Sequence, residues 1–214
     1  MRVVPFGDRE AQQAALAGIV AHVRAGGVIV YPTETVFGIG GAASLESVRR
    51  VAELKGRAET KPFLLLVSDE AQAQGLEWTE TARRLADAFW PGPLTIVLRD
   101  TARRYPQGVT SADGGVAIRR TPHAGMRLLL DELGEPVTST SANAPGEPPA
   151  RTTAEAERAL RALGDADDVW LLDGAAGDAP PSTVVDCTRD RPRLVRAGAV
   201  PLERLREVVD VVEG

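Results

Sequence analysis

The sequence predicts an α/β fold: a single domain, residues 1–214, in which helices flank a twisted sheet of mixed parallel and antiparallel strands. Short apolar runs alternate with segments of helical periodicity through most of the chain. Near the C-terminus three apolar runs follow one another, which favours a mixed sheet over a purely parallel one. Because 43% of the residues are apolar, we expect one core that needs neither disulfides nor a structural metal.

The first predicted elements lead into a polar segment. Residues 9–25 have helical periodicity and end at Gly26, because glycine suits the end of a helix. The apolar residues 28–31 form the strand that we expect next. Polar residues 33–35 follow it and lead into a glycine-rich turn at 38–41.

The later elements follow from the same patterns. A helix at 44–55 has Ser44 as its N-cap. The apolar run 63–67 does not alternate with polar residues, so we expect a strand that is buried on both faces. The remaining predicted elements are helices that end near residue 89 and at 126–133, 153–163 and 202–212, and strands at 94–98, 116–119, 137–140, 169–172, 184–187 and 193–195.

Charge and cysteine content narrow the class of protein. A net charge of -5 argues against a surface given over to nucleic-acid binding, which needs concentrated Lys and Arg. Cys187 has no partner in the chain, and neither a signal-peptide pattern nor a long apolar run is present, so we expect a cytoplasmic protein. Lys55 and Lys61 lie close together with Arg57 between them, which indicates a local anion site.

Polar side chains gather where four predicted elements end, which is where open α/β sheets bind ligands. Lys55 and Arg57 could form a triphosphate clamp, but basic residues after a helix also complement its dipole, and spacing alone favours this second interpretation. Residues 139–143 and 182–183 could equally stabilise their own turns or bind a ligand. The fourth segment is 31–35.

Two common kinds of site are absent from the sequence. The glycines at 38–41 are not followed by the Lys-Ser/Thr ending of a phosphate-binding loop, and they do not have dinucleotide-binding spacing. His22, His123 and Cys187 are too far apart for a zinc site of familiar spacing. We expect His22 at a helix surface and His123 as a cap or binding group.

Six motifs follow one another along the chain: Tyr31-Pro32-Thr33-Glu34-Thr35-Val36-Phe37-Gly38, Lys55-Gly56-Arg57, Pro91-Gly92-Pro93-Leu94-Thr95, Ser141-Ala142-Asn143, Ser182-Thr183-Val184-Val185-Asp186 and Arg196-Ala197-Gly198. Taken in this order, they resemble the motifs of the YrdC-like family of threonylcarbamoyl-adenylate synthases. The resemblance implies a concave basic cleft that uses ATP, L-threonine and bicarbonate to form threonylcarbamoyl-AMP and pyrophosphate. This nucleotidyltransferase reaction supplies a precursor for threonylcarbamoyladenosine in tRNA.

The resemblance also assigns roles to individual residues. Lys55 and Arg57 are the expected catalytic residues. The expected ATP-binding residues are Lys55, Arg57, Lys61, Thr140, Ser141, Asn143 and Arg196, and the expected threonine-binding residues are Tyr31, Thr33, Thr35, Arg119 and Ser182. A register shifted by one would make Arg120 the threonine contact, but a gap-free alignment favours Arg119. Mg²⁺ is expected to accompany ATP, with Glu34 as a candidate ligand and no tightly bound cofactor.

Two other functions are alternatives to the synthase. A YrdC-like domain that forms carbamoyl-adenylate occurs in much longer proteins, whereas this chain ends at Gly214, as expected for the short, single-domain synthase. A non-enzymatic RNA-binding or ribosome maturation protein is disfavoured by the acidic net charge and by the lack of aromatic clusters for stacking. The expected partners of the synthase are tRNA and the downstream proteins that transfer the threonylcarbamoyl group, with no membrane.

Overall fold

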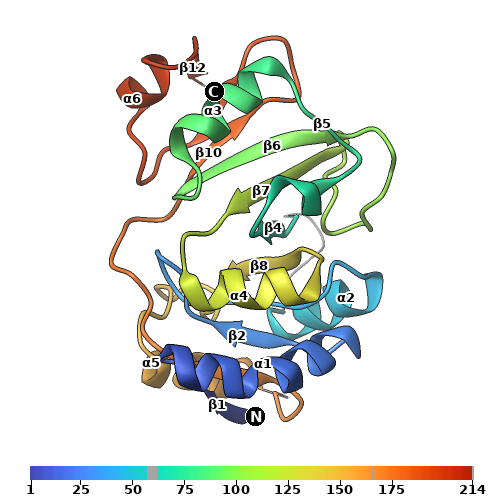
Figure 1. Ribbon diagram of the computed structural model, residues 1–214, viewed down its shortest axis with the longest axis vertical. Helices are drawn as coiled ribbons and strands as arrows, with labels where there is room; N and C mark the ends of the chain where they lie inside the picture. Colours follow the sequence, from blue (N-terminus) through green and yellow to red (C-terminus); the bar gives the residue numbers. More distant parts are fainter. Residues whose placement is uncertain (57–61, 165, 214) are drawn as a thin grey trace.

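Strands from the whole length of the chain join into one twisted, mixed sheet in the computed structural model, which describes residues 1–56, 62–164 and 166–213 (Figure 1). The strand order is β1-β9-β2-β3-β8-β4-β7-β6-β10-β11-β12, with β5 paired to β6. Their bounds are β1 Arg2–Pro5, β2 Ile29–Tyr31, β3 Gly38–Gly40, β4 Leu64–Val67, β5 Leu76–Glu77, β6 Leu94–Asp100, β7 Gly115–Arg120, β8 Val137–Ser141, β9 Trp170–Asp173, β10 Thr183–Asp186, β11 Arg193–Arg196 and β12 Val212–Glu213.

The pairing is mixed, as predicted. Strand β9 pairs in parallel with both β1 and β2, and β4 and β10 pair in parallel with β7 and β6. Strands β2, β3, β8 and β4 form a consecutive antiparallel series at the centre of the path. Strand β8 therefore joins the part of the sheet that contains the N-terminus to the part that contains the C-terminus.

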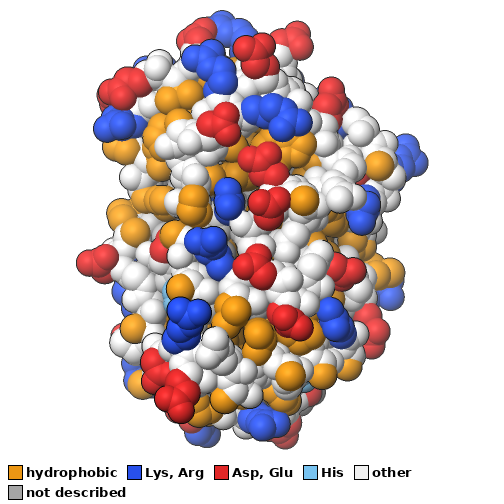
Figure 2. Space-filling model, in the orientation of Figure 1, with side chains coloured by type: hydrophobic (Ala, Val, Ile, Leu, Met, Phe, Trp, Pro, Cys, Tyr) orange, Lys and Arg blue, Asp and Glu red, His pale blue; other side chains and the backbone are white. Residues whose placement is uncertain are grey.

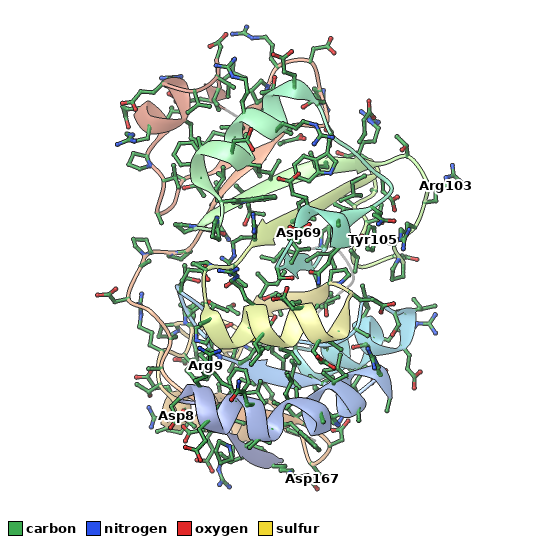
Figure 3. All side chains as sticks on the ribbon, in the orientation of Figure 1. Asp8, Arg9, Asp69, Arg103, Tyr105 and Asp167 are labelled. Atoms are coloured by element: carbon green, nitrogen blue, oxygen red, sulfur yellow. The ribbon has the colours of Figure 1, made fainter. Side chains whose placement is uncertain are left out.

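The helices are α1 Arg9–Arg24, α2 Leu45–Leu54, α3 Glu80–Phe89, α4 Ala124–Leu133, α5 Thr153–Leu163 and α6 Leu202–Arg206, with a 3₁₀ turn, η1, at Glu70–Ala73. Helices α1 to α5 begin at a side-chain cap, whereas α6 begins after Pro201 without one. Asp8, labelled in Figure 3, accepts a hydrogen bond from the backbone of Ala11 at the start of α1. Ser44 caps α2 in the same way, as the sequence predicted.

Two apolar clusters fill the space between the sheet and the helices. Helices α1 and α4 pack on one another over one end of the sheet (Figure 1), and their apolar side chains enclose Tyr31, Leu66 and Val137. The other, larger cluster contains the apolar faces of α2, α3 and α5. Both faces of the central strands are thus covered in part by helices, which agrees with the unbroken apolar run predicted at 63–67.

Two predicted elements were wrong. The glycine-rich segment predicted as a turn is strand β3, which lies between β2 and β8. Its glycines are required by close packing, because a Cβ on Gly40 would lie 1.7 Å from the carbonyl oxygen of Thr138. The C-terminal helix ends at Arg206, well short of the predicted residue 212, and residues 212–213 pair with β11 instead.

The described surface carries charges of both signs. Figure 2 shows acidic and basic side chains interspersed over the visible face. Of the helices in the described ranges, none combines the length and the apolar composition that crossing a bilayer would require.

Candidate functional site

The register of the sheet brings several predicted residues onto one face. Side chains of paired residues, and of residues two apart along a strand, lie on the same face. Leu66 of β4 pairs with Arg119 of β7 and with Val137 of β8. Ser139 and Ser141, which are two and four residues beyond Val137, therefore share the face of Arg119.

The same face continues across the next strands. Ile96 of β6 pairs with Ile118 of β7, so the side chain of Thr95 lies on the face of Arg119. Val184 of β10 pairs with both Thr95 and Arg196. We call this surface the site face and define it by Ser139, Ser141, Arg119, Thr95, Ser182 and Arg196.

Alternation along the strands separates two pairs of neighbouring candidates. Arg120 lies on the opposite face from Arg119, and its Nε donates a hydrogen bond to the carbonyl oxygen of Ser68 at 2.7 Å. Arg119 thus shares its face with Ser182 and Arg196, whereas Arg120 does not, and the choice of Arg119 over Arg120 as the threonine contact stays a prediction. Thr140 pairs with Ile39 and lies on the opposite face from Ser139 and Ser141, so its role in ATP binding stays a prediction.

Arg119 forms an ion pair with Glu34, which lies in the loop between β2 and β3. Glu34 Oε1 lies 3.3 Å from Arg119 Nε, and the two side chains are only 14% and 5% exposed. Thr121 Oγ1 donates a hydrogen bond to Glu34 Oε2 at 2.9 Å, and it accepts one from the backbone N–H of His123. The carboxylate of Glu34 therefore connects the loop after β2 to the end of β7 and, through Thr121, to the start of α4.

The loop that carries Glu34 is fixed by its own threonines. The hydroxyl of Thr33 donates to the carbonyl oxygen of Val36 at 2.6 Å and accepts from the backbone N–H of Thr35. Gly177 approaches the loop so closely that a Cβ there would lie 2.0 Å from the carbonyl oxygen of Glu34. Thr33 and Thr35 are both buried, which makes this loop a rigid edge of the site face.

Arg196 and Ser182 form a second polar group beside Arg119. Arg196 donates from Nε and Nη2 to the carbonyl oxygen of Ser182 and from Nη2 to its hydroxyl, while Thr95 Oγ1 lies 2.8 Å from Ser182 Oγ. Partial burial, and the positive charge of Arg119, lower the pKa of Arg196. Two guanidinium groups that affect each other in this way suit an anionic ligand such as a carboxylate or a phosphate.

Lys55 connects the end of α2 to the segment after β8. Its ammonium, in a residue that is 8% exposed, donates to the backbone oxygens of Ser141 and Asn143 and to Asn143 Oδ1. Ser141 Oγ also donates to Asn143 Oδ1 at 2.6 Å. The ammonium of Lys55 therefore does more than complement the dipole of α2, because it joins the motif that begins at Lys55 to the motif at 141–143.

Tyr31 and His123 have structural partners. Tyr31 is fully buried, its hydroxyl donates to the carbonyl oxygen of Thr138 at 2.9 Å, and burial raises its pKa. His123 caps α4 by accepting a hydrogen bond from the backbone N–H of Met126, and a cap is one of the two roles expected for it. Burial lowers the pKa of His123, and the carboxylate of Glu34 partly offsets this effect.

The outcome for the remaining predicted residues is mixed. Arg57 and Lys61 lie outside the described residues, so the phosphate clamp and the concave basic cleft stay predictions. Glu34 does not fit as a magnesium ligand, since its two oxygens face Arg119 and Thr121, and no cluster of three or more metal-ligating side chains occurs in the described ranges. Sequence reasoning missed Thr121, although a threonine directly after two arginines at a strand end was a usable signal.

Comparisons with known proteins agree on one family. The Sua5/YciO/YrdC family model, described as telomere recombination, matches residues 21–198. A Stenotrophomonas maltophilia protein named threonylcarbamoyl-AMP synthase is 40% identical over 181 residues, which cover 82% of this chain and 95% of the relative.

Two solved structures share the fold. Pyrococcus abyssi Sua5 in complex with L-threonine has a TM-score of 0.85 and 28% identity, and the match covers 99% of this chain and 62% of that one. Escherichia coli YciO has a TM-score of 0.79 and 25% identity, and the match covers 95% of this chain and 98% of that one.

Proposed function

Because the chain belongs to the Sua5/YciO/YrdC family, we propose that it is an L-threonylcarbamoyladenylate synthase. It forms threonylcarbamoyl-AMP and pyrophosphate from L-threonine, bicarbonate and ATP, and the product serves threonylcarbamoyladenosine modification of tRNA. Relatives named for this activity match most of the chain, and one solved relative was crystallised with L-threonine.

The observation that carries this proposal is the common face of Arg119, Ser182 and Arg196, adjoined by the group of Lys55, Ser141 and Asn143. Side chains that can donate hydrogen bonds to anionic groups therefore lie along several neighbouring strands. Two substrates that together carry a carboxylate and a triphosphate need such donors at several points along the site.

The proposed reaction has two steps. The unprotonated amine of threonine attacks the carbon of bicarbonate, and loss of water leaves a carbamate. A carbamate oxygen then attacks the α-phosphorus of ATP, the bond between this phosphorus and the bridging oxygen breaks, and pyrophosphate leaves with the electron pair. Because no covalent enzyme intermediate is needed, the protein acts by positioning its substrates and by stabilising phosphate charge.

We assign ATP to Lys55, Arg57, Lys61, Thr140, Ser141, Asn143 and Arg196, with Lys55 and Arg57 as the catalytic residues. The Lys55 ammonium supports this assignment by holding the 141–143 turn in place beside the expected phosphates. Mg²⁺ arrives with ATP and takes its ligands chiefly from phosphate oxygens and water.

We assign threonine to Tyr31, Thr33, Thr35, Arg119 and Ser182. The planar guanidinium of Arg119 suits bidentate binding of the threonine carboxylate. Tyr31 pairs with Gly38 and Gly38 with Ser141, so buried Tyr31 lies on the site face, and the two buried loop threonines flank Glu34, the counter-ion of Arg119. In this proposal residues 1–214 act as a single domain in the cytoplasm, and their product passes to tRNA through downstream transfer proteins.

The test is pyrophosphate release by the purified protein. Release from ATP is expected only when L-threonine and bicarbonate are both present, and mass spectrometry should detect threonylcarbamoyl-AMP. Release that depends on carbamoyl phosphate instead would favour a carbamoyl-adenylate-forming domain. Binding of RNA without any release would favour the non-enzymatic alternative.

A further inference from the structure

We propose that Glu34 and Thr121 are positioning residues that orient the guanidinium of Arg119 toward the threonine carboxylate. This inference rests on the proposed function, since it takes Arg119 as the carboxylate-binding residue. It adds a role for two side chains that do not themselves contact the substrate.

The first support is the way in which Arg119 is held. Its Nε and Glu34 Oε1 are both buried and lie 3.3 Å apart, yet neither atom has a hydrogen-bond partner within the described part of the chain. The contact between them is therefore electrostatic and weakly directional. A buried arginine with a single counter-ion depends on that ion for its position, because leaving the charge unpaired would be costly.

The second support is the fixed direction of the hydrogen bonds around Thr121. The backbone N–H of His123 can only donate, so Thr121 Oγ1 accepts from it and directs its own hydrogen to Glu34 Oε2. The carboxylate is thereby anchored on one oxygen while the other faces Arg119. The backbone N–H of Thr121 also donates to Val67, which fixes the anchor to the end of β4.

The third support is the neighbouring charge of Arg196. Both guanidinium groups lie on the site face, and the pKa of Arg196 is lowered by burial and, to a lesser extent, by the positive charge of Arg119. Glu34 offsets part of this repulsion. Without the carboxylate we expect Arg119 to move away from Arg196 and from the orientation that a planar, bidentate contact requires.

These contacts make Glu34→Gln a sharp test. Two buried donors, Thr121 Oγ–H and Arg119 Nε–H, face the carboxylate oxygens, and an amide offers only one oxygen. In one orientation of the glutamine Thr121 Oγ–H loses its acceptor, in the other Arg119 Nε faces an amide nitrogen, and in both Arg119 loses its counter-ion. Thr121→Val removes the anchor but keeps the charge, and Thr121→Ser keeps both.

The experiment measures L-threonine binding by calorimetry, together with steady-state pyrophosphate release. We expect Glu34→Gln to weaken threonine binding about tenfold and Thr121→Val to weaken it severalfold, with kcat and the KM for ATP changed less than about threefold. Thr121→Ser should restore wild-type binding. In an Arg119→Ala background, Glu34→Gln should add less than about a twofold effect. Thermal melting checks that each variant is folded.

The outcomes separate this inference from the proposed function. Equal effects of Glu34→Gln with and without Arg119, or a matching rise in the KM for ATP, would overturn the positioning role in an active synthase. If Glu34→Gln does not fold, Thr121→Val and Thr121→Ser decide the question, and unchanged threonine binding in both would overturn the proposal. Coupled threonine binding without pyrophosphate release would instead contradict the proposed reaction and leave the positioning role standing.

Discussion

The ammonium of Lys55 lies 2.9 Å from Asn143 Oδ1, a side chain 88 residues further along the sequence. This contact connects the end of α2 to the turn at the end of β8, whose hydroxyl and amide groups also bond to one another and to the carbonyl oxygen of Glu147. It also gives Lys55 two roles that can be measured separately: it shapes the 141–143 turn, and in the proposed reaction it faces the phosphates of ATP.

Lys55→Ala should reduce turnover by roughly 10²-fold or more, because it removes a positive charge from the proposed phosphate site. Arg57→Ala should have an effect of the same size. The measurement is pyrophosphate release at saturating threonine and bicarbonate, with the melting temperature as a check on folding. The matched control is Arg158→Ala, which removes a positive charge from an exposed position in α5 and should leave turnover unchanged. Near-normal turnover in both site variants would contradict the clamp.

Gly40→Ala should destabilise the protein by more than about 3 kcal/mol or prevent folding, since its Cβ would lie 1.7 Å from the backbone oxygen of Thr138. Gly18→Ala is the matched control in α1, where the nearest atom, in Trp170, would be 3.7 Å away. This second change should stabilise by about 0.5–1 kcal/mol, because glycine is a poor helix former. Denaturant unfolding measures both, and equal stabilities would show that β3 tolerates a side chain.

Arg103→Gly should raise stability by about 0.5–1 kcal/mol, because Arg103 has a φ of 48°, a left-handed conformation that is costly for residues with a side chain. Arg104→Gly changes the next residue, which has no such φ, and should be destabilising by a similar amount. Both arginines lie in the loop after β6 (Figure 3 labels Arg103) and are exposed. A stability loss of equal size in both variants would argue against strain at 103.

The thiol of Cys187 should be unreactive in the folded protein. Burial, together with the nearby charge of Asp186, raises its pKa to about 12, so the thiolate that reacts with disulfide reagents is scarce at pH 8. We expect a chromogenic disulfide reagent to label the thiol only after unfolding. Rapid labelling of native protein at pH 8 would mean that the segment around β10 opens readily.

Local patterns predicted most of the helices and the mixed character of the sheet. The bounds predicted for α5 agree with the structure because a threonine cap and a strong apolar stripe mark it in the sequence. Strand β3 was missed because glycine usually signals a turn, whereas here the neighbouring backbone of β8 leaves no room for a Cβ. The C-terminal helix was overextended because a later apolar run, residues 208–212, has helical spacing but serves β12 and the core.

For the site, motifs could nominate residues but could not give the side of the sheet on which each one lies. Arg119 and Arg120 are alike in chemistry and, being adjacent in a strand, lie on opposite faces, but only the pairing of β7 with β4 and β6 shows which of them shares a face with the other candidates. The link from Thr121 to Glu34 spans 87 residues and depends on the same pairing. Contacts of this range follow from the topology of the whole sheet and are not encoded in any local pattern.

The position of β9 between β1 and β2 has a consequence for synthesis of the protein. Arg2 pairs with Trp170 and Ile29 pairs with the same residue, so β1 has no neighbour, and β2 has only β3, until most of the chain exists. Such nonlocal pairing slows folding, because a long loop must close before its contacts repay the lost entropy. A nascent chain that has emerged only through β8 therefore carries three of the six motifs in full on an incomplete sheet, and we expect ligand binding only after the last third has left the ribosome.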